Sequence, residues 1–410
     1  MSGLLDGIRV IESAMLFNGD RLGVLLGDLG ADVVKVEAPP VGDYLRDFLG
    51  QIVPHHSPAH LEVNKHKRSV VINLRVEAGR EVFWKLLATA DVFVDGNAGD
   101  AMERLGVGYE QQRAHKPDIV YCQYSGYGSY GPYASIPTHG QMMNALAADT
   151  PYDMGPDGKM HASPRLGGMQ GINGGEGTAT GAIYAAYAVA AALLRRERTG
   201  AGAYIDVAAS DAVVANSWIG ATYSLNDARI ADRSTMPVTG DQGDGAKYQF
   251  YETKDRKVIL FCGIEPKFWK NFCAAVGRDD LVGAEATAPV DFAGGQAELR
   301  QELQRIFHTR DLADWVQVAI DHDIAMGPAY RTAAELPDDP HVAARGLFHP
   351  AQHPIAGPYT HVGFPARIAG STYEVQRGAP TLGQHTDEVL TAAGVSTAEL
   401  AALREARAIT

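Results

Sequence analysis

The sequence predicts an α/β protein with a large, doubly wound domain on a parallel sheet and a smaller α+β domain. Three observations predict this fold class. At 410 residues the chain is too long for one compact core, so two domains are expected. Short β-branched runs alternate with helical patterns in the first half of the chain, whereas a hairpin and two amphipathic helices follow in the second. We place the large domain at residues 1–225, completed by 335–410, and the small domain at 226–334.

The first βαβ unit occupies the first 40 residues or so. "GIRVIES" predicts a strand, "RLGVLLGDLG" a helix that ends at Gly30, and "ADVVKVEAP" a second strand closed by Pro39 and Pro40. Strands joined through a helix pair in parallel, with a right-handed crossover. "SVVINL", "DVFVDG" and "DIVYCQYSG" continue the sheet as buried strands, with the helix "EAGREVFWKLLATA" before the second of them. This order predicts the doubly wound sheet.

The later elements follow from the same patterns. A helix of small residues runs from Gly181 to "RRERTG", with Gly200 as its C-cap, and "AYIDVAASDAV" predicts a strand and then a helix. "DRSTMPVTGDQGDGAK" predicts a linker or loop. "YQFYETKDRKVILFCGI" predicts the hairpin of the small domain. Its helices are predicted at "PKFWKNFCAAVG" and "AELRQELQRIFHTRDLADWVQVAIDHD".

Composition excludes several function classes. The net charge is -13 and no run of Lys and Arg is present, which argues against a nucleic-acid partner. Three cysteines without a CxxC pair suit a reducing compartment and no structural zinc. The N-terminus has no charged leader, and the longest apolar stretch is about 13 residues, shorter than a membrane helix needs. We therefore expect a cytoplasmic protein with no metal and no membrane partner.

Glu176 stands among glycines ahead of the small-residue helix, in "GINGGEGTATGAIYAAYA". The glycines allow the backbone to approach a ligand, and the helix start offers free N–H groups. Two interpretations are open. Glu176 is either a nucleophile or base in a pocket lined by backbone, or it is a helix cap and nothing more.

Two further residues are candidates for acid–base chemistry. His139 follows the Gly/Pro/Tyr-rich loop "SGYGSYGPY", and histidine shuttles protons near neutral pH; the alternative is a satisfied, half-buried side chain. Glu265 lies in "CGIEPKFW", between a strand and a helix. It is either an N-cap ahead of Pro266 or a carboxylate that projects into a ligand site between domains.

The cluster "NKHKRSVVINL" places Lys65, Lys67 and Arg68 beside the start of a strand. These cations could hold phosphates, or they could form a solvated turn. HExxH, GxSxG and Walker motifs are absent from the sequence, so zinc hydrolase, serine hydrolase and NTPase chemistry lack their usual residues.

Motifs along nearly the whole chain resemble those of the family III CoA-transferases, which include carnitine CoA-transferase, formyl-CoA transferase and α-methylacyl-CoA racemase. They include "LLDGIRVIES", "LGDLGADVVKVEAPPVGDYLR", "NKHKRSVVINLR", "PDIVYCQYSGYGSYGPY" and "DDPHVAARGLF". The resemblance implies an interlocked, ring-like homodimer and acyl-CoA substrates, with coenzyme A bound as the thioester. It also implies that Arg46, Arg104 and the basic cluster help to hold the CoA phosphates.

Family transferases use an aspartate just before the small-residue helix, where it attacks the thioester and forms an anhydride. In this sequence that aspartate falls near Gly177 or Thr178, and Glu176 is the nearest carboxylate. The resemblance therefore implies that Glu176 is the nucleophile, in a position shifted by one or two residues. An alignment on the glycines instead puts Ile172 or Asn173 there and leaves no nucleophile.

The racemase branch uses a histidine and that carboxylate to exchange the α-proton, assisted by a glutamate from an "IEP" element. His139 and Glu265, in "GIEPKF", match those positions. The racemase run "GDFGGG" is replaced by "GINGGEG", and "DGNAG" stands where relatives have a Glu-Asn-Phe-Arg-Pro run, so that Asn97 is shifted by one. Three functions stay open: CoA transfer, racemisation of a 2-methylacyl-CoA, and CoA binding without catalysis.

Overall fold

The computed structural model describes residues 3–163, 174–233, 245–283 and 289–410. Most of the predicted linker, and the start of the glycine-rich stretch before Glu176, lie outside the described residues. The chain forms two compact units. Unit one contains the described parts of 3–163, 174–217 and 343–410, and unit two contains those of 218–342. The C-terminal segment thus folds with the first unit.

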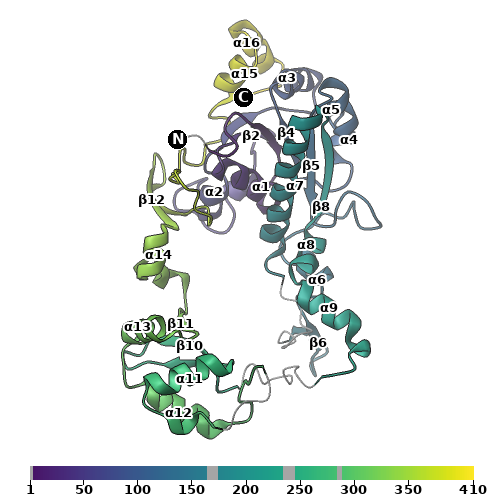
Figure 1. Ribbon diagram of the computed structural model, residues 1–410. Coiled ribbons are helices and arrows are strands. Elements are labelled where there is room, and N and C mark those ends of the chain that lie inside the picture. The colour runs from purple at the N-terminus through teal and green to yellow at the C-terminus, as the bar shows by residue number, and fades with distance from the viewer. Residues whose placement is uncertain (1–2, 164–173, 234–244, 284–288) are drawn as a thin grey trace. The chain divides into compact units, whose positions relative to one another are not determined.

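Six parallel strands form the centre of unit one (Figure 1). Their order across the sheet is β3-β2-β1-β4-β5-β8, and every neighbouring pair is parallel. The predicted parallel sheet is confirmed. The strands are β1 (Arg9–Ser13), β2 (Asp32–Glu37), β3 (Arg68–Val71), β4 (Val92–Asp95), β5 (Val120–Ser125) and β8 (Ala203–Ala208).

Helices pack on both faces of this sheet because alternate strand residues point to opposite faces. Figure 1 shows α1 (Phe17–Asp28) and α7 (Gly177–Thr199) side by side on one face, where Val10, Val94 and Val189 share a buried cluster. On the other face α3 (Glu77–Leu87) packs with α15 (Thr386–Ala392), and Ile11 and Phe93 join that cluster. Two separate cores on one sheet are the doubly wound arrangement.

Unit one contains further short elements besides the sheet and the helices that cover it. They are η1 (Tyr44–Arg46), α2 (Pro58–Val63), α4 (Ala101–Arg104), α5 (Tyr109–His115), α6 (Met142–Leu146), α8 (Ala209–Asn216), α16 (Thr397–Glu405) and two hairpins, β6 (Tyr152–Met154) with β7 (Met160–Ala162) and β12 (Phe348–His353) with β13 (Gly357–Val362).

Helix α7 matters most for the site. It ends as predicted, at Gly200 in the left-handed conformation, but it begins four residues earlier than Gly181, at Gly177. By length and composition α7 could cross a membrane, yet it contacts β5, β8, α1 and α8 and buries Ala182, Ala185 and Val189 in the core of unit one. Its apolar character is therefore that of a helix packed on a sheet.

Unit two is a small α+β body. The predicted hairpin is confirmed as β9 (Tyr248–Glu252) and β10 (Val258–Cys262), which are antiparallel. The third strand, β11 (Met326–Ala329), was not predicted. Aromatic side chains of α11 (Pro266–Ala275), α12 (Ala297–Phe307) and α13 (Leu312–His322) pack on one another. Its other elements are α9 (Trp218–Asn226), η3 (Asp227–Arg229), η4 (Asp279–Leu281), η5 (Ala333–Asp338) and the start of α14 (Pro340–Arg345), which crosses the boundary.

Candidate active site

A cavity of about 200 Å³ opens at the carboxyl edge of the sheet, where β1 and β4 are neighbours. Here the strand order reverses, and ligands of open α/β sheets bind at such switch points. We call it the strand-edge cavity. Its lining residues lie at or beyond the carboxyl ends of β1 to β4, and two more lie in α4 or directly after it. They are Ser13–Met15, Val36–Pro39, Gly42, Asp43, Ile72–Arg75, Asn97, Met102 and Leu105.

A second cavity of about 180 Å³ shares Met15 and Asn97 with the first, and we call it the His139 cavity. Both cavities belong to unit one. The second is lined by Met15–Asn18, Tyr44, Gly96–Ala98, Ser125, Gly126, Pro137–Gly140 and Thr178. Because Thr178 is in the first turn of α7, this cavity ends beside the N-terminus of that helix.

Glu176 is the N-cap of α7 and is exposed. Its carboxylate accepts hydrogen bonds from Thr178 N (3.0 Å), Ala179 N (2.8 Å) and the Thr178 hydroxyl. Glu176 therefore caps α7, and its predicted role as nucleophile stays a prediction. Capping does not exclude chemistry, because the same residue stands next to Thr178 at the wall of the His139 cavity.

Asn144 fixes the backbone on either side of Glu176. Its Nδ2 donates to the Gly175 carbonyl (2.8 Å), and its Oδ1 accepts from Gly177 N (3.0 Å). The side chain is 5% exposed. Nothing in the sequence around residue 144 marked it, because its role depends on a contact between segments about 30 residues apart.

The glycines around Glu176 have separate structural reasons. A Cβ on Gly174 would come within 1.9 Å of the Val213 carbonyl oxygen, and Gly175 has φ +85°. A Cβ on Gly177 would point at Asn144 Oδ1, 3.0 Å away. A side chain at 177, where the family aspartate was one expectation, would begin against Asn144 and Met143 of α6.

His139 is exposed and lines the cavity that bears its name. Its carbonyl accepts from Met142 N at the start of α6. Glu265 is half-buried at the N-cap of α11, with Pro266 in the first helical position and no capping bond from its side chain. It belongs to unit two, so its predicted role beside Glu176 stays a prediction.

A buried ionic cluster underlies the strand-edge cavity. The Lys35 ammonium contacts Glu12 (3.1 Å), Asp43 (3.0 Å) and Asp20, and all four side chains are fully buried. Burial would lower the pKa of Lys35, but the surrounding carboxylates raise it well above its usual range. Burial raises the pKa of Asp20, and it does the same for Asp43 with the help of the neighbouring acid.

Lys67 belongs to this cluster. Its Nζ donates to both carboxylate oxygens of Glu12 (2.9 and 2.8 Å) and to the Asp20 carbonyl (2.9 Å), and its side chain is completely buried. Burial alone would raise the pKa of Glu12, but Lys67 and Lys35 lower it. All three ammonium protons therefore have acceptors inside the protein.

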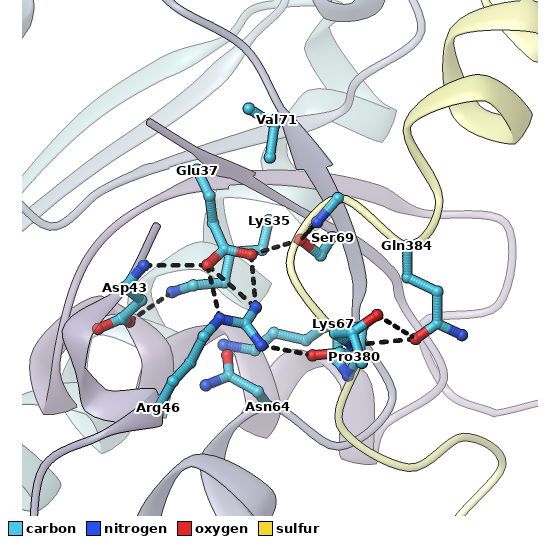
Figure 2. A network of polar contacts seen from close by, with 12 residues as sticks. Lys35, Glu37, Asp43, Arg46, Asn64, Lys67, Ser69, Val71, Pro380 and Gln384 are labelled. Atoms are coloured by element: carbon cyan, nitrogen blue, oxygen red, sulfur yellow. Dashed lines mark hydrogen bonds and ion pairs between the residues drawn. The ribbon is translucent and has the colours of Figure 1, made fainter. Parts of the chain in front are cut away.

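Arg46 is also buried and fully paired. Figure 2 shows its guanidinium between the Glu37 carboxylate, with contacts of 2.8 and 3.0 Å from Nη2, and the Pro380 carbonyl, 2.7 Å from Nη1. The ring of His60 lies 3.0 Å from Nη1. Burial, with the charges of Arg46 and Lys35, lowers the pKa of His60 to about 2, so this ring is neutral at physiological pH.

The other predicted phosphate ligands lie elsewhere. Lys65 is buried and pairs with Glu62. Arg68 begins β3 and binds Asp32, the first residue of β2, and Glu388, so it lies at the amino edge of the sheet, opposite the cavities. Arg104 is exposed and pairs with Asp100. The structure does not bring these three together, and their role in CoA binding stays a prediction.

Arg75 was not predicted as a site residue. It is exposed and lines the strand-edge cavity just beyond the carboxyl end of β3. The signal was present in "SVVINLR", because a cation that follows the end of a parallel strand lies at the ligand-binding edge. Within residues 3–163, 174–233, 245–283 and 289–410, no group of three or more His, Cys, Asp or Glu side chains could hold a metal ion.

A profile of the family described as CoA-transferase family III matches residues 5–386. The chain belongs to this family. Among its relatives is the human succinyl-CoA:glutarate CoA-transferase, 27% identical over 94% of this chain and 85% of that protein. The acetyl-CoA:oxalate CoA-transferase of Acetobacter aceti is 29% identical over 93% and 94% of the two chains.

Two solved structures are similar over nearly the whole chain. A CAIB/BAIF family protein from Brucella suis superimposes with a TM-score of 0.73, at 26% identity over 96% of this chain and 100% of that one. Rv3272 from Mycobacterium tuberculosis gives a TM-score of 0.70, at 28% identity over 95% and 99%. Family membership and the named relatives support a transferase that uses CoA thioesters.

Proposed function

We propose that this protein transfers CoA from an acyl-CoA to a carboxylic acid, with Glu176 as the nucleophile. The observation that carries the proposal is the pair of adjoining cavities at the switch point of the sheet, the second of which ends beside the helix start that Glu176 caps. The nucleotide end of CoA would occupy the strand-edge cavity, where Arg75 supplies positive charge for its phosphates.

The Glu176 carboxylate attacks the thioester carbonyl, the C–S bond breaks, and an acyl-glutamyl anhydride and CoA thiolate form. The thiolate attacks the glutamyl carbonyl of the anhydride, which gives glutamyl-CoA thioester and releases the first carboxylate. The acceptor carboxylate attacks the glutamyl carbonyl of this thioester, the C–S bond breaks, and a second mixed anhydride and CoA thiolate form. The thiolate then attacks the acyl carbonyl of this anhydride, which gives the new acyl-CoA and restores the Glu176 carboxylate. Thr178 N and Ala179 N, once the attacking carboxylate releases them, would stabilise the oxyanions.

Three capping hydrogen bonds hold the carboxylate before attack. The oxygen that attacks must first break its capping hydrogen bonds, so capping and nucleophilic attack compete for the same carboxylate oxygens. Two variants separate these roles. Glu176→Ser keeps a good N-cap residue but has no carboxylate, and Glu176→Gln keeps the shape.

The test is transfer of CoA from acetyl-CoA or succinyl-CoA to an added acid, run in heavy water. We expect both variants to lose at least 1,000-fold in kcat while their thermal midpoints stay within a few degrees of the parent. Glu399→Gln, in the capping box of α16, is the matched control for loss of a helix-capping carboxylate. A Glu176→Ser variant at full rate would exclude the proposed nucleophile.

A second candidate function is racemisation of a 2-methylacyl-CoA. The observation in its favour is His139, which lines the same cavity as Thr178. The same experiment distinguishes the two, since racemisation puts deuterium at the α-carbon without moving CoA to the added acid. A protein that does neither but binds CoA is the non-catalytic alternative.

The interlocked homodimer, the domain limits 1–225 with 335–410 and 226–334, and the cytoplasmic location are part of this proposal. Exposed apolar side chains along α7 support a partner subunit: Ile183 is 58%, Tyr187 75% and Leu194 54% exposed in the single chain. Light scattering on the purified protein tests the dimer, with a monomer mass as the contrary result.

A further inference from the structure

Asp95 is a fully buried carboxylate at the carboxyl end of β4, and the proposed mechanism does not use it. Its Oδ1 accepts from the backbone N and from Nδ2 of Asn97 (2.9 and 2.8 Å), and its Oδ2 accepts from the Tyr121 hydroxyl (2.8 Å). Three donors thus converge on one carboxylate, which suits its ionised form.

The turn that follows, residues 96–99, is held from both sides. Asn97 Nδ2 also donates to the Ser13 carbonyl at the end of β1 (3.1 Å). Gln123 Nε2 donates to the carbonyls of Asn97 (3.3 Å) and Gly99 (2.6 Å), and the Tyr204 hydroxyl in turn donates to Gln123 Oε1 (2.7 Å). Hydrogen bonds therefore run from β8 through β5 to this turn.

This turn is the wall that the two cavities share. Asn97 lines both of them, and Gly96 and Ala98 line the His139 cavity. Gly96 also packs so closely that an added Cβ would lie 2.5 Å from the Ala14 side chain. The departure of "DGNAG" from the family pattern thus has a structural counterpart: the Asn97 amide turns back to Asp95 and Ser13 and ties the turn to the sheet.

We propose that Asp95 is a positioning residue for CoA: its ionised carboxylate fixes the 96–99 turn in the shape that both cavities need. This inference rests on the proposed function only in taking CoA as the ligand. Protonation at Oδ1 would set the new O–H against two Asn97 N–H groups, and protonation at Oδ2 would force the Tyr121 hydroxyl to reverse its hydrogen bond. Either change removes the negative charge that strengthens the hydrogen bonds from Asn97, so the turn would loosen.

The pKa of Asp95 lies in a range where this change can be measured. Burial raises it to about 6, against the lowering effect of the hydrogen bonds from Asn97 and Tyr121, and Glu103 on α4 adds a smaller upward shift. CoA carries a phosphate whose own ionisation lies near pH 6, so the informative quantity is the difference between parent and variant at each pH.

The test is the Kd for CoA, measured by calorimetry from pH 5 to pH 8 on the full chain. The parent should bind about tenfold more weakly at pH 5 than at pH 8 beyond the contribution of the ligand phosphate. Asp95→Asn should bind about tenfold more weakly than the parent at pH 8, with only the ligand contribution left in its pH profile. The acid limb is the part of the pH profile in which affinity for CoA falls as the pH falls. In Tyr121→Phe the acid limb should move to higher pH, because a hydrogen bond that lowers the pKa of Asp95 is gone.

Tyr109→Phe is the matched control, since this ring packs against Tyr121 but its hydroxyl is outside the network described above. The inference is wrong if Asp95→Asn binds CoA like the parent at pH 8, or if the acid limb of Tyr121→Phe coincides with that of Tyr109→Phe. If Asp95→Asn does not fold, the two tyrosine variants decide.

The same measurements distinguish this inference from the proposed function. A parent that binds CoA with this pH profile but transfers none would refute the proposed function and leave this inference standing. Failure to bind CoA would refute both.

Discussion

The Nζ of Lys67 lies 2.8 Å from Glu12 Oε2, and neither side chain has any exposed surface. A basic residue that the sequence offered as a phosphate ligand is thus an internal counter-ion of the sheet. The distinction can be measured, because a buried ion pair that loses one partner leaves an unpaired charge, whereas a surface cation that is removed leaves little behind.

Lys67→Met should therefore destabilise the fold by about 3–5 kcal/mol, the usual consequence of breaking a buried pair on one side. Urea denaturation followed by intrinsic fluorescence measures the change in the free energy of unfolding. The double variant Lys67→Met with Glu12→Leu should recover part of the loss, because it also removes the buried carboxylate that Lys67→Met leaves with Lys35 as its remaining counter-ion. Equal stability of the single variant and the parent would contradict the structural role.

Arg75→Met should leave stability nearly unchanged, because this side chain is exposed, and should raise the KM for acyl-CoA about tenfold, or ~1.4 kcal/mol. The loss should shrink at high salt, since the attraction to the CoA phosphates is screened. Arg113→Met, an exposed arginine on α5, is the matched control. Equal effects of the two variants on KM would remove Arg75 from the site.

The fold was largely predictable, because it depends on local patterns of apolar residues. The alternation of β1, α1 and β2 and the Gly200 cap of α7 are properties of a few adjacent residues. The short strand β11 was missed because "MGPA" has no strand pattern of its own and pairs only through its neighbour β10.

The site was less predictable, because charge alone does not say where a side chain points. Lys67 and Arg75 are close in the sequence and both are cationic, yet Lys67 is buried whereas Arg75 lines a cavity. Asn144 and Asp95 carried no recognisable motif, since each acts through bonds to segments that only the folded chain brings close.

Gly96→Ala should be destabilising by about 1–3 kcal/mol, the typical result of overpacking. The new Cβ would lie 2.5 Å from the Ala14 Cβ and 3.0 Å from its Cα, and backbone cannot move aside as a flexible side chain can. We also expect weaker CoA binding, because the turn lines the His139 cavity. Thermal melts and calorimetry measure both effects. Gly327→Ala, where a Cβ meets nothing within 4 Å, is the control.

Because His60 is buried as a neutral ring, the fold should become less stable as the pH falls. The pKa of His60 is about 2 in the folded chain against an ordinary 6.5, so the unfolded chain binds a proton that the folded chain refuses. Above pH 6.5 His60 is neutral in both the folded and the unfolded chain, and it costs the folded chain no stability. As the pH falls below 6.5, the free energy of unfolding falls by up to ~1.4 kcal/mol per pH unit, because only the unfolded chain takes up the proton. The free energy of unfolding of parent and His60→Gln, measured from pH 5 to 7.5, should differ by this slope. Parallel curves would show that His60 titrates normally; other groups, such as Asp95, cancel in the comparison.

Asn144 links the geometry of Glu176 to the rate of the proposed reaction. Its amide holds Gly175 and Gly177 on either side of the carboxylate, so Asn144→Leu should let the start of α7 shift while the nucleophile itself is retained. A misplacement of about 1 Å costs on the order of 100-fold in rate, so kcat should fall about 10- to 100-fold with a much smaller change in the KM for acyl-CoA. Asn144 Nδ2 also donates to Asp149 Oδ2 (2.8 Å), so Asn144→Asp would lose the donor to Gly175 and set two buried carboxylates against each other; its kcat should be at least as low as that of Asn144→Leu. Steady-state kinetics of the three proteins decide the point, because a role confined to stability would lower the thermal midpoint and leave kcat per folded molecule unchanged.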